Sequence, residues 1–256
     1  MTPDWYVVLL LCAVAAAAGW VDAVSGGGGL LQLPALLLVT PADAPATALG
    51  TNKLSSIFGT SAAAITYGRI EMPRLKTALP MAAAAFLGAA LGSLTAIHLP
   101  ATVFRPIILV SLIVVWLFVA LRRSFGLIER EVSRGRHLVT AIVGGVAIGF
   151  YDGAIGPGTG SFLIILLVAA VGYTFLQASA TAKIVNVGTN AASLIVFGIS
   201  GSVLWIVGAL MAICNVAGAV VGARTAIARG SEFVRTVLLI VTAVLIAVLA
   251  VQIIRG

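Results

Sequence analysis

The chain has 256 residues, of which 61% are hydrophobic and only 9% are charged. Soluble domains carry about a quarter of their residues as charged side chains, which cover their surface. The composition therefore excludes a soluble protein and predicts an integral membrane protein. The net charge of +7 would suggest nucleic-acid binding in a soluble chain, but here the basic residues are interpreted as topology signals, and no nucleic-acid partner is expected.

Long unbroken apolar runs, such as Val237–Ile254, predict helices rather than the short alternating segments of a membrane β-barrel. The predicted fold is an all-α integral membrane protein surrounded by the lipid bilayer. A linker rich in arginine, residues 122–136, separates two sets of five apolar segments. In chain order these segments are Trp5–Val24, Leu30–Val39, Pro45–Tyr67, Leu75–His98, Ala101–Leu121, then Leu138–Ile155, Ser161–Val171, Phe175–Ile199, Val203–Ile227 and Phe233–Ile254.

The second segment of each set is too short to cross a membrane. It has about 11 residues, or roughly 16 Å of helix, against a hydrocarbon core of about 30 Å. We therefore expect a broken or re-entrant short helix in each half.

The two halves match each other without a gap at an offset of 130 residues. Alanine-rich helices often match by chance, but chance does not also align both intramembrane aspartates and both lysines. We infer an internal repeat, with repeat 1 at 1–121, the linker at 122–136 and repeat 2 at 137–256. The aligned pairs include Gly19 with Gly149, Asp22 with Asp152, Gly26 with Gly156, Thr51 with Thr181, and Lys53 with Lys183.

Five segments per repeat is an odd number, which predicts that the second repeat is inverted in the membrane. The distribution of basic residues supports this. With the N-terminus outside, 11 of the 15 lysines and arginines fall in inside loops, and only Arg105 and Arg255 fall outside. The positive-inside rule then places the linker 122–136 in the cytoplasm.

Each repeat begins with an apolar helix that runs into a glycine cluster. Glycine runs break a helix, and Pro157 removes a further backbone donor. The next short helix then starts at membrane depth with free N–H groups, which together with the helix dipole bind anions. The predicted contacts are Gly27, Gly28, Gly29, Gly158, Thr159, Gly160 and Ser161.

The alternative is that these glycines only allow close helix packing. Close packing is our preferred interpretation of the two spaced pairs, Gly88 with Gly92 and Gly218 with Gly222.

Four ionisable residues fall inside the predicted membrane segments: Asp22, Lys53, Asp152 and Lys183. Charges at this depth are costly and indicate a functional site by default. We expect the two lysines to bind an anion and the two aspartates to orient the lysines or carry protons. The alternative left open is a pair of structural Asp–Lys contacts that hold the broken helices.

Neutral hydrogen-bonding residues near the lysines complete the predicted site: Thr51, Asn52, Thr181, Asn186 and Asn190. A spacing of one turn puts Asn52 with Ser56, and Asn186 with Asn190, on one helix face. Such faces suit a lined cavity, and they suit interhelical hydrogen bonds equally well. No metalloprotease, nucleotide-binding or hydrolase motif is present, so we expect no enzyme, no catalytic residues, no metal and no cofactor.

At these residues the sequence resembles the TauE/SafE sulfite exporter family, also called the toluenesulfonate uptake permeases. The resemblance covers nearly the whole chain, and it is the combination of stretches that is specific. Four stretches carry it: Gly19-Trp20-Val21-Asp22 through Gly26-Gly27-Gly28-Gly29, Gly50-Thr51-Asn52-Lys53-Leu54, Gly149-Phe150-Tyr151-Asp152-Gly153 through Gly156-Pro157-Gly158-Thr159-Gly160, and Ala180-Thr181-Ala182-Lys183 with Asn186 and Asn190.

The resemblance implies a secondary transporter of small sulfur-containing anions, sulfite or organosulfonates such as sulfoacetate, in the bacterial plasma membrane. It also implies proton-coupled export, which would proceed by alternating access of one repeat against the other. Members of the family differ in substrate and direction, so uptake, or a channel for another small anion, is the alternative. A homodimer is left open.

Overall fold

A computed structural model of the protein describes residues 5–40, 44–70, 74–98 and 134–255, together with residues 110, 113, 116, 117, 120 and 121. The structure is all-α over these ranges, as predicted. Two of its elements, η2 and η3, are single π-helical turns. The elements are α1 (Trp5–Ser25), α2 (Gly29–Leu37), α3 (Pro45–Gly68), α4 (Leu75–Ala96), α6 (Arg134–Val139), η2 (Thr140–Gly144), α7 (Gly145–Ala154), α8 (Thr159–Leu166), η3 (Leu167–Val171), α9 (Phe175–Ile199) and α10 (Trp205–Arg255).

The helices follow the predicted segments closely, and the short second helix of each half is present as α2 and α8. The predicted segment Ala101–Leu121 and the linker 122–136 lie largely outside the described residues. The two segments predicted as separate helices meet at Gly230, a non-helical residue inside the element labelled α10. This glycine has φ 74°, a left-handed conformation that side-chain-bearing residues rarely adopt.

Five helical stretches in the described parts of the chain are long and apolar enough to cross a membrane. Helix α3 is not among them, although it has 24 residues. Its central turns carry Asn52, Lys53 and Ser56, which lower its hydropathy. The five stretches are Trp5–Ser25, Leu75–Ala96, His137–Ala154, Phe175–Ile199 and Trp205–Val244.

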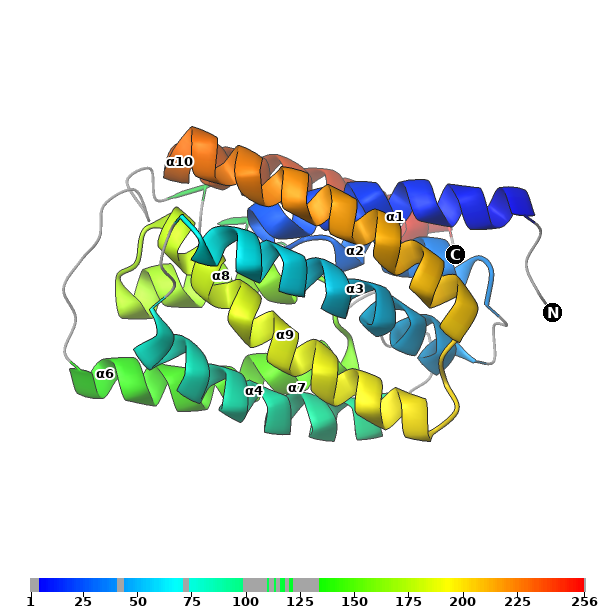
Figure 1. Cartoon of the computed structure of the whole chain (residues 1–256), viewed down its shortest axis with the longest axis horizontal. Helices are drawn as coiled ribbons and strands as arrows, with labels where there is room; N and C mark the ends of the chain where they lie inside the picture. Colours follow the sequence, from blue (N-terminus) through cyan, green and yellow to red (C-terminus); the bar gives the residue numbers. More distant parts are fainter. Residues whose placement is uncertain are drawn as a thin grey trace.

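Helices α3 and α9 contact each other and lie between the upper and lower layers of the molecule (Figure 1). On one side α10 packs against α3 and α1, and on the other α4 packs against α9 and α7. Helices α1 and α10 form the upper layer in Figure 1, and α4 lies with α6 and α7 at the bottom. The polar middle of α3 is therefore enclosed by other helices.

The helix pairs α1–α10 and α4–α7 touch backbone to backbone at glycines. A Cβ atom on Gly218 would lie 1.9 Å from the carbonyl oxygen of Ala16, and one on Gly92 would lie 2.1 Å from that of Phe150. Because no side chain fits at such distances, these contacts confirm that the spaced glycine pairs serve close packing. Both interfaces join a helix of the N-terminal half to one of the C-terminal half.

Helix starts recur along the chain at a constant interval. Helix α2 begins at Gly29 and α8 at Thr159, and α3 begins at Pro45 and α9 at Phe175. Both intervals are 130 residues, the offset of the sequence match. The interval from the start of α4 at Leu75 to that of α10 is the same.

The end of α3, the starts of α4 and α6, and the kink of α10 lie at one end of the molecule, at the left in Figure 1. Tyr173 links two of these elements there, because its hydroxyl lies 2.9 Å from Thr77 Oγ1 and its ring contacts His137. Ser231, beside the bend, accepts a hydrogen bond from the backbone N–H of Leu176. Exposed basic residues at this end are Arg69, Arg74, Lys76 and Arg229.

Candidate functional site

The two glycine breaks meet at the centre of the molecule. A Cβ atom on Gly26 would lie 2.2 Å from the carbonyl carbon of Gly160, so neither position accepts a side chain. Gly26 also has φ 79°, which glycine adopts without strain. Ser161 Oγ donates a 2.8 Å hydrogen bond to the carbonyl oxygen of Ser25 and ties the breaks together. The starts of α2 and α8 therefore point into one central region.

Two ion pairs cross between the halves in this region. Lys53 Nζ on α3 lies 2.8 Å from Asp152 Oδ2 on α7, and Lys183 Nζ on α9 lies 2.8 Å from Asp22 Oδ2 on α1. Each lysine thus pairs with the aspartate of the other half. The sequence leaves open whether the aspartates and lysines form structural pairs. Both pairs are present, and each joins residues that are far apart in the chain.

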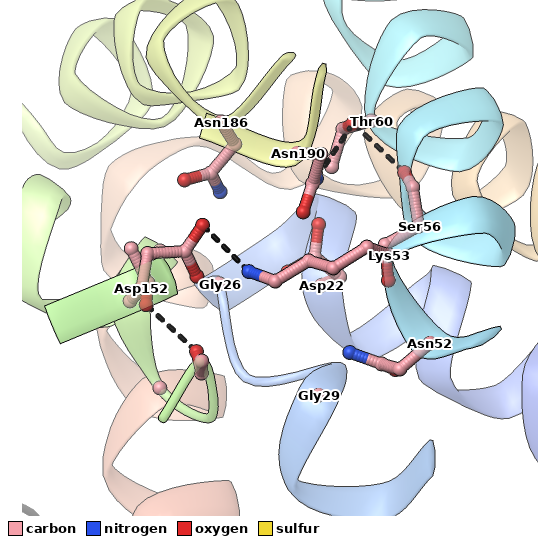
Figure 2. Close-up of a pocket in the computed structure, with 14 residues that line it drawn as sticks. Asp22, Gly26, Gly29, Asn52, Lys53, Ser56, Thr60, Asp152, Asn186 and Asn190 are labelled. Carbon is pink, nitrogen blue, oxygen red and sulfur yellow. Dashed lines mark hydrogen bonds and ion pairs between the residues drawn. The ribbon is translucent and has the colours of Figure 1, made fainter. Parts of the chain in front are cut away.

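A small polar cavity lies beside the Lys53–Asp152 pair, shown in Figure 2. The space that a water centre can occupy in it is about 30 Å³, which is two to three times the roughly 10–15 Å³ that one buried water needs. Its size suits a small, hydrated or oxygen-rich solute. Its lining comprises Asp22, Gly26, Gly29, Asn52, Lys53, Ser56, Thr60, Asp152, Gly156, Gly158, Thr159, Gly160, Asn186 and Asn190.

The two lysines differ in their surroundings. The Lys53 side chain is 2% exposed and lines the cavity. The Lys183 side chain is fully buried outside the lining, and its ammonium donates to both the carboxylate and the backbone carbonyl of Asp22. Its partner Asp22, whose side chain is 20% exposed, does line the cavity. Only one of the two predicted cationic partners therefore faces the cavity.

Two of the amides that line the cavity have a side-chain oxygen without a hydrogen-bond partner. Asn52 and Asn186 are each only 4% exposed, and the carbonyl oxygen of each side chain has no partner among the described residues. Figure 2 shows both amides directed toward the space around the Lys53–Asp152 pair. Asn190 differs, because its Nδ2 donates a 3.4 Å hydrogen bond to Thr60 Oγ1. Because the Asn52 and Asn186 side chains line the cavity, both amides are candidates for contacts with a solute.

The structure brings together ten of the predicted site residues around the cavity: Asp22, Gly29, Asn52, Lys53, Asp152, Gly158, Thr159, Gly160, Asn186 and Asn190. The other six, Gly27, Gly28, Thr51, Ser161, Thr181 and Lys183, lie outside its lining. The hydroxyls of Thr51 and Thr181 donate to carbonyl oxygens one turn earlier in their own helices, so these two are occupied within the helices.

Four lining residues were absent from the predicted site: Gly26, Ser56, Thr60 and Gly156. Thr60 lies one helical turn beyond Ser56, and the offset of 130 aligns it with Asn190. Extending the comparison of the two repeats by one turn along α3 would have added Thr60 to the predicted site. Gly156 and Gly26 are aligned with each other, and they lie in the glycine clusters from which their neighbours were chosen.

Comparison with known proteins decides the family. A family model described as sulfite exporter TauE/SafE matches residues 11–249. The chain belongs to the TauE/SafE family. This membership makes it a multi-pass membrane protein of a transporter family and not an enzyme.

Several TauE/SafE relatives are similar to the chain over most of their length. A probable membrane transporter protein of Sinorhizobium sp, ORF9, is 38% identical, and the alignment covers 93% of this chain and 90% of the relative. The probable membrane transporter YfcA of Escherichia coli K12 is 35% identical, with 91% and 86% covered. A probable membrane transporter protein of Haemophilus influenzae is 32% identical, with 92% and 91% covered. No solved structure matches the chain.

Proposed function

We propose that this TauE/SafE protein is a secondary transporter of small sulfur-containing anions, sulfite or organosulfonates such as sulfoacetate, in the bacterial plasma membrane. One observation carries the proposal beyond family membership: a small cavity where the two glycine breaks meet, lined by Lys53 and by the amides of Asn52 and Asn186. Buried cavities of this polarity, enclosed by apolar helices, are where transporters hold their solutes.

The anion would lie beside Lys53 and the starts of the two short helices. Gly29 begins α2 and Thr159 begins α8, and both line the cavity. Free N–H groups and helix dipoles favour negative charge at such starts. Asp152 holds Lys53, and Asp22 holds Lys183. In this proposal the aspartates orient the lysines, or one of them carries the coupled proton.

Transport would proceed by alternating access between two inverted repeats, residues 1–121 and 137–256. The recurring helix starts and the reciprocal ion pairs across the halves support this arrangement. The basic end of the molecule supports the proposed orientation, since Arg69, Arg74 and Lys76 would face the cytoplasm. The linker 122–136 would lie on the same side, and the N-terminus outside.

The test is transport in liposomes that contain the purified protein. We expect saturable counterflow of sulfite or of a sulfonate, and a current if the cycle moves net charge. Counterflow identifies a carrier, because a channel gives none, and imposed pH gradients of either sign report the coupling and the direction. Absence of flux with sulfite, methanesulfonate and sulfoacetate would refute the proposed substrates.

Replacing Lys53 tests the proposed site. We expect Lys53→Gln to abolish transport, because the cavity then has no cation beside it. The double variant Lys53→Gln/Asp152→Asn removes the pair without leaving a buried carboxylate unpaired, and it should also be inactive while eluting as a folded protein. Lys76→Gln, which changes an exposed lysine, should transport normally. Normal transport by the folded double variant would place the binding site elsewhere.

A further inference from the structure

The charges around the cavity constrain the charge of its solute. The charged residues that face it are Lys53, Asp152 and Asp22, and Lys183 pairs with Asp22. Two lysines and two aspartates cancel, so this region has no net positive charge before a solute enters. The cost of transferring an ion from water to a buried site grows with the square of its charge. A doubly charged anion is therefore disfavoured far more strongly than a singly charged one.

The hydrogen-bonding groups around the cavity also favour a singly charged anion. Besides Lys53, the cavity presents the carboxylates of Asp22 and Asp152, which accept hydrogen bonds, and the amides of Asn52 and Asn186. Each amide offers one donor group and one acceptor. A fully deprotonated oxyanion has only acceptors, and it offers no donor to the carboxylate oxygens. A singly protonated oxyanion carries one donor that can meet them.

We propose that the site binds singly charged oxyanions, and that it takes sulfite as hydrogensulfite, with the carboxylates of Asp22 and Asp152 setting this preference. The inference rests on the proposed function and specifies the substrate of that same site. Sulfonates fit it as well, because they carry one negative charge across the whole physiological pH range. Sulfate fits poorly, because it is a dianion over that range.

The experiment measures sulfite counterflow in proteoliposomes with the same pH on both sides, over a series from acidic to alkaline pH. We expect the KM, when expressed as hydrogensulfite concentration, to stay constant, while the KM for total sulfite rises with pH. Methanesulfonate should compete with sulfite at every pH, and sulfate should not. A constant KM for total sulfite, or competition by sulfate equal to that by methanesulfonate, would overturn the inference.

The amides are tested by Asn52→Ala and Asn186→Ala. The loss of a hydrogen bond to a charged ligand should raise the KM for hydrogensulfite about tenfold for each amide, and the KM for methanesulfonate by a similar factor, because an amide N–H can donate to either anion. Ser193→Ala is the matched control. It removes a buried, unpartnered hydroxyl from the same helix as Asn186, away from the cavity. An effect of the control as large as that of the amide variants would assign the amides a structural role.

The two proposals fail in different ways. If no sulfur anion is transported at any pH, the proposed function itself is wrong. If sulfite is transported but its dianion and monoanion are used alike, the proposed function stands and this inference alone is wrong.

Discussion

At the scale of single residues, burial distinguishes the two lysines: we assign a structural role to Lys183 and a functional role to Lys53. Its ammonium is enclosed and bonded twice to Asp22, whereas Lys53 faces the cavity. The residue type and the repeat made the two lysines equivalent in the sequence. The difference between them comes from tertiary packing, which places Lys53 in the cavity lining and Lys183 outside it.

The Lys183–Asp22 pair should therefore contribute mainly to stability. Removing one partner of a buried ion pair costs about 3–5 kcal/mol, because the other charge remains unpaired. We expect Lys183→Met to lower the melting temperature of the detergent-purified protein strongly. Adding Asp22→Asn should restore most of the loss, since it removes the remaining charge. Thermal unfolding of the two single variants and the double variant measures this coupling, and purely additive effects would contradict it.

At the scale of helices, the glycine contacts set how closely the two halves approach. Gly218 and Gly68 make a matched pair for a test, since a Cβ on Gly218 would overlap Ala16 while one on Gly68 would meet nothing within 4 Å. We expect Gly218→Ala to separate α1 from α10 and to destabilise the protein by about 1–3 kcal/mol or more. Gly68→Ala should change stability by about 0.5 kcal/mol at most. Melting temperatures of both variants check this, and equal values would contradict the contact.

The helices themselves were largely predictable from the sequence, and their meeting points were not. Apolar run lengths and glycine clusters located α1 to α4 and α7 to α10 because each signal is local. The separation of the two segments within α10 was predicted correctly, because one left-handed residue, Gly230, breaks the helix between them. The π-helical turn η2, within the segment Leu138–Ile155, leaves no recognisable pattern in the sequence.

At the scale of the whole molecule, the site depends on contacts between distant parts of the chain. Intramembrane charge identified Lys53 and Asp152 as candidates, but the choice of partner across the halves could not be read from their spacing. The same applies to Thr51 and Thr181, whose hydroxyls bond within their own helices. The internal repeat was the most informative signal in the sequence, because it already aligned Thr60 with Asn190.

Because each ion pair joins the N-terminal half of the chain to the C-terminal half, two separately produced halves should depend on each other. Each half alone would carry a lysine and an aspartate without partners, together with glycine surfaces shaped for the other half. Two fragments divided within residues 122–136 and produced in the same cell should therefore find each other and copurify through a tag on one of them. Either fragment produced alone should be degraded. Exchanging the charges of one pair, by Lys53→Asp on one fragment and Asp152→Lys on the other, should restore the assembly that either exchange alone weakens.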